Sequence, residues 1–296
     1  MQNEDSLIKG IQDGSFAALA RAITLVENDI QPAAQLLRKI SVDASIPVIG
    51  ITGPPGAGKS TLVNAITSHI VREGKKIAIL AVDPTSPFNF GSLLGDRIRM
   101  AQQFNNPQVY IRSLATKGSL GGISAKTIEI VDVVRSAGFD MILVETVGVG
   151  QSEVEIAGLA DKTVVVLVPE SGDEIQHIKS GMMEVAQGFV VNKSDRDGAD
   201  AFANSLYKLV HQQQQEVPVF KTVADKNEGI AELCSWLLEP VQIENERKSL
   251  LLIEKALKII QHYRMANVDK AELSAAMELA RKSKDFNIYR FIDAWV

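Results

Sequence analysis

Residues 50–66 read GITGPPGAGKSTLVNAI, and this stretch decides the fold. It holds the spacing Gly53-x-x-x-x-Gly58-Lys59-Ser60 between an apolar run and an amphipathic stretch. This spacing is typical of a phosphate-binding loop, in which backbone N–H groups surround the phosphates of a nucleotide. Glycines are expected there because a Cβ would block the approach of the phosphates. The sequence therefore predicts a strand, a phosphate loop and a helix, in that order.

Two side chains of this loop have expected roles in chemistry. Lys59 can reach the β- and γ-phosphates, and the Ser60 hydroxyl is a candidate ligand for Mg²⁺. The helix that begins at Lys59 adds its positive N-terminal end. The predicted phosphate-binding set is Gly53, Pro54, Pro55, Gly56, Ala57, Gly58, Lys59, Ser60 and Thr61.

Short apolar runs with strand character recur between residues 46 and 240, separated by amphipathic stretches of about 10 to 20 residues. The runs are PVIGIT, KIAILAV, VYIRSLA, MILVET, TVVVLVP, GFVVNKS and VPVFKTV. Such alternation predicts an α/β fold, a P-loop NTPase with a mostly parallel sheet covered by helices on both faces. We expect KIAILAV to lie beside the phosphate-loop strand.

Both ends of the chain are predicted to be helical. Near the N-terminus, apolar residues recur at the spacing of one helix face, at Phe16, Leu19, Ile23 and Val26. We divide the chain into a helical N-terminal extension (1–45), a P-loop domain (46–240) and a helical C-terminal extension (241–296). Asp269 and Glu272 resemble a helix-start signal. Apolar residues recur at helical spacing in the C-terminal extension. They form two stripes: Leu250, Ile253, Leu257 and Ile260, then Leu273, Ala276, Met277 and Ala280.

Composition limits the class of protein. The chain has 296 residues, is 46% hydrophobic and 23% charged, and carries a net charge of −5. The negative charge argues against nucleic acid or an anionic membrane as the main partner, and the apolar runs are too short to span a membrane. The single cysteine, Cys234, forbids an internal disulfide and is expected to be a small buried side chain. The start MQNEDSLIKG lacks signal or transit character, so we expect a cytoplasmic protein unless a presequence was removed.

The segment FVVNKSD predicts which base is recognised. The carboxylate of Asp195 can accept hydrogen bonds from N1–H and the exocyclic amine of guanine, a donor pair that adenine lacks. Lys193 can lie along the base plane, and Asn192 can brace the loop and the purine edge. In the later segment TVADKNEGI, the Ala224 N–H could donate to the guanine oxygen, with Val223 beside it. The predicted ligands are GTP and GDP.

Two acids are expected at the carboxyl edge of the sheet, where open α/β folds bind ligands. Glu145 lies at the end of the run MILVET and is a candidate for holding Mg²⁺ or its water. The Gly148 N–H is expected near the γ-phosphate. Asp83, at the end of KIAILAV, is a candidate for positioning the attacking water. For both acids, a helix cap or a surface salt bridge is the alternative.

The segment GSLLGDRIRM adds Asp96, Arg97 and Arg99. Asp96 is a further candidate ligand for the metal. A catalytic role and a solvated helix start are both open for this segment.

At this point several motifs together resemble one family. They are GPPGAGKST, DPTSPFNFGSLLGDRIRM, IRSLATKGSLGGIS, GFDMILVETVGVGQSE, SGDEIQHIKSGMMEVA and VVNKSD, in this order. They are similar to the ArgK/MeaB family of P-loop GTPases, to which the methylmalonic aciduria type A protein belongs. The resemblance implies a homodimeric GTPase that escorts adenosylcobalamin to methylmalonyl-CoA mutase or a similar mutase, protects it and supports its reactivation. It also implies that the C-terminal extension could serve as a dimerisation arm.

The resemblance also assigns residues. A glutamate replaces the usual aspartate in the third GTPase motif of this family, which places Glu145 at the metal site. The glycine-rich tail that follows resembles a second switch region and makes Gln151 a catalytic candidate. Residues 83–99 correspond to the first switch. Residues 171–179 correspond to a third switch that senses the mutase. Its candidate contacts are Gly172, Asp173, Glu174 and Lys179.

Three other functions stay open. One is a phosphotransferase tied to arginine and ornithine transport, an older label of the same family. Another is a nickel-insertion GTPase, but such proteins use Cys and His ligands, and one Cys and four scattered His here show no ligand spacing. Of the histidines, only His177 has a plausible functional location. The third is a nucleotide-gated interaction protein that serves no mutase.

Overall fold

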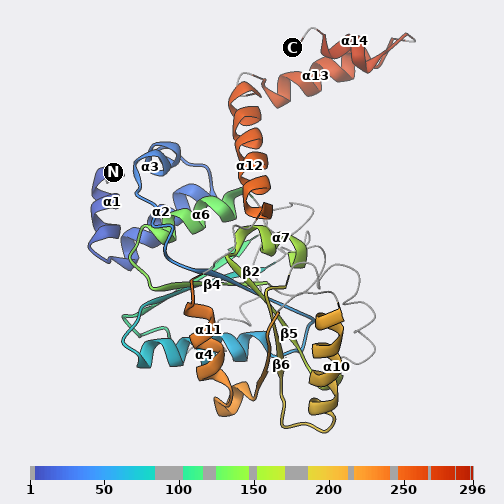
Figure 1. Cartoon of the computed structure of the whole chain (residues 1–296). Coiled ribbons are helices and arrows are strands. Elements are labelled where there is room, and N and C mark those ends of the chain that lie inside the picture. The colour runs from blue at the N-terminus through green and yellow to red at the C-terminus, as the bar shows by residue number, and fades with distance from the viewer. Residues whose placement is uncertain are drawn as a thin grey trace. The chain divides into compact units, whose positions relative to one another are not determined.

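The computed structural model describes residues 4–83, 103–115, 125–146, 152–170, 186–212, 217–240, 246–265, 268–283, 285–293 and 295. The chain divides into two compact units, residues 1–248 and residues 249–296. Each unit is described by itself below, with the elements labelled as in Figure 1.

A sheet of seven strands forms the centre of the first unit (Figure 1). The strands lie in the order β3-β2-β4-β1-β5-β6-β7, and all neighbours are parallel. Each of the apolar runs named above forms one strand, which confirms the predicted fold class. The strands are β1 (Val48–Thr52), β2 (Ile77–Asp83), β3 (Val109–Ala115), β4 (Met141–Thr146), β5 (Lys162–Leu167), β6 (Gly188–Asn192) and β7 (Val219–Thr222).

The neighbour of the phosphate-loop strand differs from our expectation. We expected KIAILAV, now β2, beside β1, but β4 lies between them. Glu145 of β4 is in register with Ile51 on one side and with Ala81 on the other. All residues of β4 are buried, as a central strand covered on both faces requires. The expectation was wrong because apolar runs show which segments are strands, not which strands pair.

Helices cover both faces of the sheet. On one face, α1 (Glu4–Gln12), α2 (Phe16–Glu27), α3 (Ala33–Lys39), α6 (Ala125–Arg135) and α7 (Ser152–Leu159) share one apolar cluster with the sheet. On the other face, α4 (Lys59–Arg72) and α11 (Ile230–Leu238) share a second cluster. Helix α10 (Ala199–Gln212) packs on β5, β6 and β7. Figure 1 shows these layers, with α2 and α6 on the opposite side of the sheet from α4 and α11.

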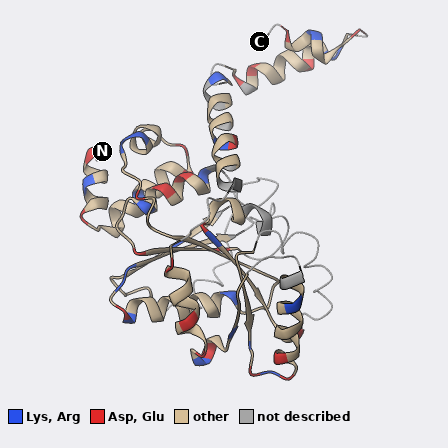
Figure 2. Cartoon of the chain, viewed as in Figure 1, with Lys and Arg blue, Asp and Glu red and all other residues tan. Residues whose placement is uncertain are grey.

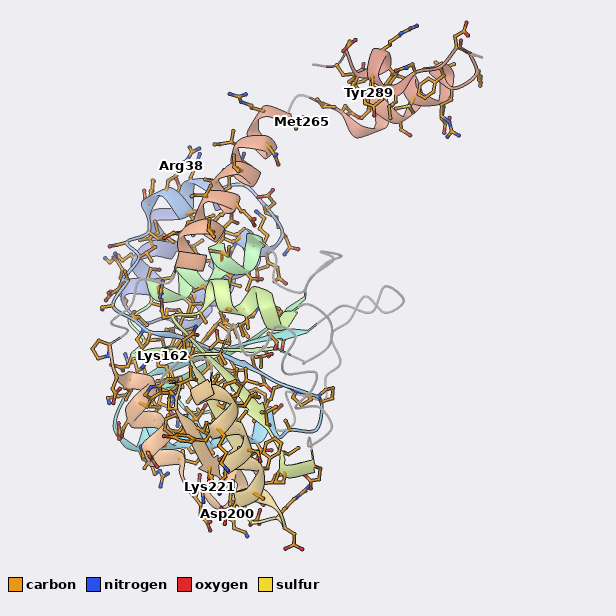
Figure 3. All side chains as sticks on the ribbon, turned by 45° about the vertical axis from the view of Figure 1, so that its right-hand side comes forward. Arg38, Lys162, Asp200, Lys221, Met265 and Tyr289 are labelled. Carbon is orange, nitrogen blue, oxygen red and sulfur yellow. The ribbon has the colours of Figure 1, made fainter. Side chains whose placement is uncertain are left out.

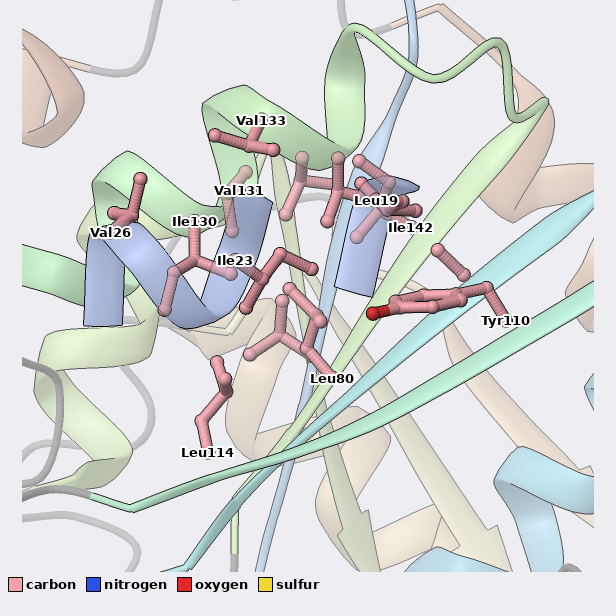
Figure 4. Packing of buried hydrophobic residues seen from close by; sticks show 14 of the residues in the cluster. Leu19, Ile23, Val26, Leu80, Tyr110, Leu114, Ile130, Val131, Val133 and Ile142 are labelled. Carbon is pink, nitrogen blue, oxygen red and sulfur yellow. The ribbon is translucent and has the colours of Figure 1, made fainter. Parts of the chain in front are cut away.

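The N-terminal helices share a core with the sheet (Figure 4). Their apolar stripe, predicted from helical spacing, is fully buried at Leu19, Ile23 and Val26. Arg112 of β3 also donates to Glu27 of α2 at 2.8 Å. The labelled partners in Figure 4 come from α6 and three strands: Ile130, Val131, Val133, Leu80, Tyr110, Leu114 and Ile142. These helices therefore pack as part of the first compact unit.

The second unit contains most of α12 (Glu246–Met265), together with α13 (Lys270–Ala280) and α14 (Ile288–Ile292). The Asp269 carboxylate accepts hydrogen bonds from the backbone N–H groups of Ala271 and Glu272, at 2.7 and 3.0 Å. The predicted helix start is thus confirmed. The predicted stripe of α12 is not buried in this chain. Its members are exposed at Leu250 (62%), Ile253 (58%), Leu257 (53%) and Ile260 (50%).

Charged residues lie mainly on helices and loops, while the strands are mostly uncharged (Figure 2). Within the described ranges, no helix is long and apolar enough to cross a membrane.

Candidate functional site

The phosphate-loop sequence sits at the carboxyl end of the central strand. Strand β1 ends at Thr52 and α4 begins at Lys59, so residues 53–58 form the connecting loop. Lys59 and Ser60, the first two residues of the helix, are each 7% exposed. The predicted order of strand, loop and helix is therefore observed. The N–H groups at the start of α4 have no partner within the helix and can face an anion.

Two glycines of this loop are required by neighbouring protein atoms. Gly53 has φ +138°, and a Cβ there would lie 2.1 Å from the carbonyl oxygen of Val166 in β5. Gly58 has φ +86°, and its Cβ would lie 2.5 Å from Nδ2 of Asn192. We expected the glycines to make room for phosphates. The structure adds that they let the loop pack against β5 and β6.

The Lys59 side chain folds over its own loop. Its Nζ donates to the carbonyl oxygens of Gly53 and Pro54, at 2.7 and 3.0 Å. These contacts satisfy an ammonium group that burial would otherwise penalise. They also hold the positive charge at the loop, where the sequence places the phosphates.

Ser60 and Glu145 meet in the structure although 85 residues separate them. The Ser60 hydroxyl donates to the Glu145 carboxylate at 2.8 Å, and Glu145 is 7% exposed. Because Glu145 is buried, it is not part of a surface salt bridge, and one of the two alternatives is excluded. Its contact with Ser60 at the start of α4 leaves a helix cap open. A hydroxyl and a carboxylate at one buried point are oxygen donors of the kind that Mg²⁺ prefers, so these residues fit the metal. The metal role itself stays a prediction.

Asn192, the last residue of β6, joins three segments of the site. Its Nδ2 donates to the carbonyl oxygen of Ala57 in the phosphate loop at 3.0 Å. Its Oδ1 accepts from the Thr222 hydroxyl at 3.1 Å and from the Ala224 N–H at 3.2 Å. The residue is 2% exposed, so these bonds satisfy an amide that would be costly to leave unpaired. Asn192 therefore braces the loop as expected.

The same contacts modify our expectation for Ala224. We expected its N–H to donate to the guanine oxygen, but in this structure it donates to Asn192. Val223 and Ala224 are buried, at 4% and 5% exposure, within the turn that follows β7. The base contact of this turn stays a prediction.

The two charged residues of the NKSD segment also have protein partners. Lys193 has a left-handed backbone (φ 56°), and its Nζ donates to the carbonyl oxygen of Gly56 at 2.8 Å. Asp195 forms an ion pair with Lys226, Oδ2 to Nζ at 2.8 Å. The hydrogen bond from Lys226 is the main cause that lowers the pKa of Asp195 below its ordinary value. Sequence analysis missed Lys226. The only available signal was its place in the segment VADKNEG, which does not show that it faces an acid 31 residues earlier.

Several predicted residues cannot be compared with the structure. The backbone of Asp83 ends β2 in register with Ala115, but its side chain lies outside the described residues. The candidates from the switch segments lie outside as well: Asp96, Arg97, Arg99, Gly148, Gln151, Gly172, Asp173, Glu174, His177 and Lys179. Their roles stay predictions.

The described part of the chain gives no support to a nickel site built from Cys and His ligands. There, no group of three or more His, Cys, Asp or Glu residues is placed to hold a metal ion. Cys234 lies in α11 at 1% exposure, and burial raises the pKa of its thiol to about 12. A buried thiol of this kind is inert, which confirms the structural role expected for it.

Comparison with known proteins agrees with this geometry. The model of the family described as "Methylmalonyl Co-A mutase-associated GTPase MeaB" matches residues 19–272. A Pyrococcus horikoshii protein named as a candidate GTPase is 41% identical and covers 99% of this chain and 97% of its own. The GTPase ArgK of Escherichia coli is 42% identical over 70% of this chain and 66% of its own. The methylmalonic aciduria type A homolog of Caenorhabditis elegans is 40% identical over 66% of this chain and 53% of its own.

Two solved structures share the fold of this chain. A crystal structure of an LAO/AO transport system kinase has a TM-score of 0.68 and 27% identity, and the match covers 100% of this chain and 99% of the other. The nickel complex of HypB from Helicobacter pylori has a TM-score of 0.50 and 17% identity, over 74% of this chain and 93% of the other, and shows a shared fold alone. With its phosphate loop, its Ser60–Glu145 contact and these relatives, the chain belongs to the MeaB family of methylmalonyl-CoA mutase-associated GTPases.

Proposed function

We propose that this protein hydrolyses GTP to GDP and phosphate, with Mg²⁺, and couples turnover to an adenosylcobalamin-dependent acyl-CoA mutase such as methylmalonyl-CoA mutase. Through this coupling, the protein would gate the loading, protection or reactivation of the mutase cofactor. One observation carries the nucleotide part of the proposal. Asn192 ties the phosphate loop to the turn that follows β7, so the phosphate-binding and base-reading segments form one hydrogen-bonded site.

The phosphate half of the site stabilises charge. Lys59 lies on the loop that would hold the phosphates and supplies a positive charge for the γ-phosphoryl group as negative charge develops on it. Ser60 and Glu145 would hold Mg²⁺ or its water. When bound, this ion neutralises the phosphate oxygens. Positioning the attacking water is assigned to Asp83 and to Gln151.

The base half of the site provides discrimination. The Asp195 carboxylate can accept two hydrogen bonds from guanine, because an aspartate is ionised at neutral pH. The hydrogen bond from Lys226 lowers its pKa further. Adenine would leave this charge without donors, which is the kind of mismatch that proteins reject strongly. The Lys193 amine donates to the carbonyl oxygen of Gly56, so the aliphatic part of this side chain runs from the base-reading segment to the phosphate loop.

The mutase part of the proposal rests on the family and on residues 171–179. Strand β5 ends at Leu167 at the same edge of the sheet as β1, so residues 168–170 leave the sheet on the side of the phosphate loop. A segment with two arrangements, one favoured by GTP and mutase together, would couple binding to hydrolysis.

The test of the coupling is GTP turnover with and without the mutase of the source organism. We expect slow basal hydrolysis and clear acceleration by the mutase. Charge reversal at Asp173, Glu174 or Lys179 should leave basal turnover nearly unchanged and remove the acceleration. If stimulation survives all three reversals, the coupling surface lies elsewhere. Turnover that ignores every mutase would favour an interaction protein, and turnover that requires an amino-acid acceptor would favour a phosphotransferase.

We also propose that the protein is a homodimer. The exposed stripe of α12, formed by Leu250, Ile253, Leu257 and Ile260, supports self-association because soluble proteins rarely leave such a stripe uncovered. Light scattering should give twice the mass of one chain. Replacing Leu257 with glutamate should give the mass of a single chain, and a wild-type monomer would contradict the proposal.

A further inference from the structure

We propose that Lys226 is the positioning residue for Asp195: it holds the carboxylate in the orientation that reads guanine and so sets the preference for the 2-amino group of the base. This inference rests on the proposed recognition of guanine. It concerns a charged partner of the base-reading segment that the sequence motifs leave out.

The backbone that carries Lys226 is firmly built. Val223 and Glu228 pair with each other in both directions, N–H to carbonyl oxygen at 3.1 and 3.2 Å, which closes a tight turn around Lys226. The Lys226 N–H itself donates to the carbonyl oxygen of Val223 at 3.0 Å. The turn ends at Gly229 (φ +71°), where a Cβ would lie 2.1 Å from the carbonyl oxygen of Lys221. Lys226 is thus presented from a rigid support.

The backbone that carries Asp195 is fixed to the same support. The Ser194 N–H donates to the carbonyl oxygen of Thr222 at 3.0 Å, which joins the NKSD segment to the end of β7. The Arg196 N–H donates to the carbonyl oxygen of Lys193 at 3.1 Å. Both backbones around the Asp195–Lys226 pair are therefore fixed, while the side chains remain 40% and 53% exposed. The direction of the carboxylate therefore depends on the contacts that the side chain itself makes, and the hydrogen bond from Lys226 has the largest effect on the pKa of this carboxylate.

Lys226 is the neighbour that makes this contact. Val223, where the turn begins after β7, is apolar and offers no side-chain donor. Arg196, next in the chain, is paired with Glu170 instead. The Lys226 Nζ contacts Oδ2 of Asp195 at 2.8 Å.

The ion pair is compatible with base recognition. An exposed pair contributes little to folding, so stability does not explain its presence. A carboxylate has about four acceptor positions on its two oxygens, so Oδ2 can accept from Lys226 and still accept from the base. A carboxylate already held in one orientation loses less conformational entropy when the ligand binds.

The test compares the affinities of GDP, IDP and ADP for four proteins by calorimetry. Inosine lacks the 2-amino group of guanine, so the GDP-to-IDP ratio reports how well Asp195 accepts both donors. The variants are Lys226→Met, which keeps the apolar length, and Lys226→Arg, which keeps the charge. The matched control is Lys221→Met. Lys221 of β7 is equally exposed, at 53%, and forms an ion pair at the same 2.8 Å, but its partner is Asp200 of α10 (Figure 3).

We expect Lys226→Met to weaken GDP binding by roughly 3- to 10-fold, the range for losing the preorganisation of one side chain, with a smaller loss for IDP. The GDP-to-IDP ratio should fall, Lys226→Arg should restore it, and Lys221→Met should match the wild type. Equal thermal unfolding midpoints of the two methionine variants would show that folding is not the cause.

Three outcomes would contradict the inference. An unchanged GDP-to-IDP ratio in Lys226→Met would show that Lys226 does not orient the carboxylate. Tighter GDP binding in that variant would show that Lys226 competes with the base. Equal binding of GDP and ADP by the wild type would overturn guanine recognition itself, and it is distinguishable because it needs no variant.

Discussion

The phosphate half and the base half of the site hold their charged groups in different ways. Lys59 and Glu145 are each 7% exposed, and both contact protein groups of the same half. Asp195 and Lys226 are paired too, but their side chains are 40% and 53% exposed. The first set is part of the packed protein, whereas the second lies at its surface.

This difference in burial suggests that the phosphate half serves catalysis and the base half serves selectivity. A buried charge must be paired at all times, so the phosphate half is organised together with the fold and changes there should affect catalysis strongly. An exposed ion pair adds little to stability and can share its hydrogen bonds with a ligand, so changes in the base half should alter selectivity. The predictions below test this separation, from the largest expected effect to the smallest.

Removing either key side chain of the phosphate loop should abolish turnover. Lys59→Ala removes the charge that we propose to stabilise the transferred phosphoryl group, and Ser60→Ala removes the hydroxyl that donates to Glu145. We expect GTP hydrolysis to fall at least about 100-fold in each. Phosphate release under single-turnover conditions measures the effect. Activity within a few-fold of wild type in either variant would contradict the assignment of this half to catalysis.

Replacing Glu145 should change the response to metal. Glu145→Ala removes the buried carboxylate beside Ser60. We expect the Mg²⁺ concentration for half-maximal turnover to rise about 10-fold or more. The measurement is a Mg²⁺ titration of GTP hydrolysis, with Glu145→Gln as the variant that keeps the shape. A titration curve equal to that of the wild type would leave Glu145 with a structural role only.

Removing the Asn192 amide should loosen the link between the two halves. Asn192→Ala removes the hydrogen-bond partner of two buried backbone groups, the Ala57 carbonyl and the Ala224 N–H. We expect a loss of about 2 to 3 kcal/mol in the free energy of unfolding, together with weaker GDP binding. Denaturant unfolding measures the first effect, and the exposed Asn204 on α10, changed to alanine, is the control. Equal stability of both variants would show that the link is not needed.

The smallest effect concerns a buried group in the core between the N-terminal helices and the sheet. Burial raises the pKa of Tyr110 to about 12, and its hydroxyl has no hydrogen-bond partner among the described residues. The folded protein therefore keeps this proton above pH 10, where the unfolded chain loses it. The contribution of Tyr110 to the free energy of unfolding is therefore fully present below pH 10 and is lost as the pH rises toward 12.

Tyr110→Phe should reduce this alkaline loss without lowering stability at neutral pH, because no hydrogen bond is removed. Unfolding midpoints between about pH 8 and 11 measure the change, with Tyr207→Phe on α10 as the control. A residual slope should persist because burial raises the pKa of Cys234 in the same direction. An identical pH profile for the wild type and Tyr110→Phe would contradict the account of this core.

Much of the fold could be predicted because its signals are local. The apolar runs located all seven strands, and helical spacing located the buried stripe of α2. The spacing around Lys59 placed a loop between strand and helix. The order of the strands was not predictable, since β4 is as apolar as its neighbours and nothing in it shows that it lies beside β1.

The candidate site divides in the same way. The sequence pointed to Ser60 through the phosphate-loop spacing and to Glu145 as an acid at the carboxyl end of an apolar run, and the structure joins them at 2.8 Å. The pair of Asp195 and Lys226 was missed because an exposed ion pair between distant segments leaves no pattern in the sequence. The role of Gly58 was understood only in part, since its close neighbour, Asn192, is brought in by the fold.

The central claim is that Asp195 makes this protein specific for guanine nucleotides. The most direct measurement is the affinity of wild type and Asp195→Asn for GDP, XDP and ADP by calorimetry. We predict that the wild type prefers GDP and binds ADP far more weakly, because the carboxylate accepts from both donors of guanine. Asp195→Asn should shift the preference to XDP, because an amide can donate to the second keto group of xanthine. Equal affinity of the wild type for GDP and ADP, or an unchanged preference for GDP in Asp195→Asn, would contradict the claim.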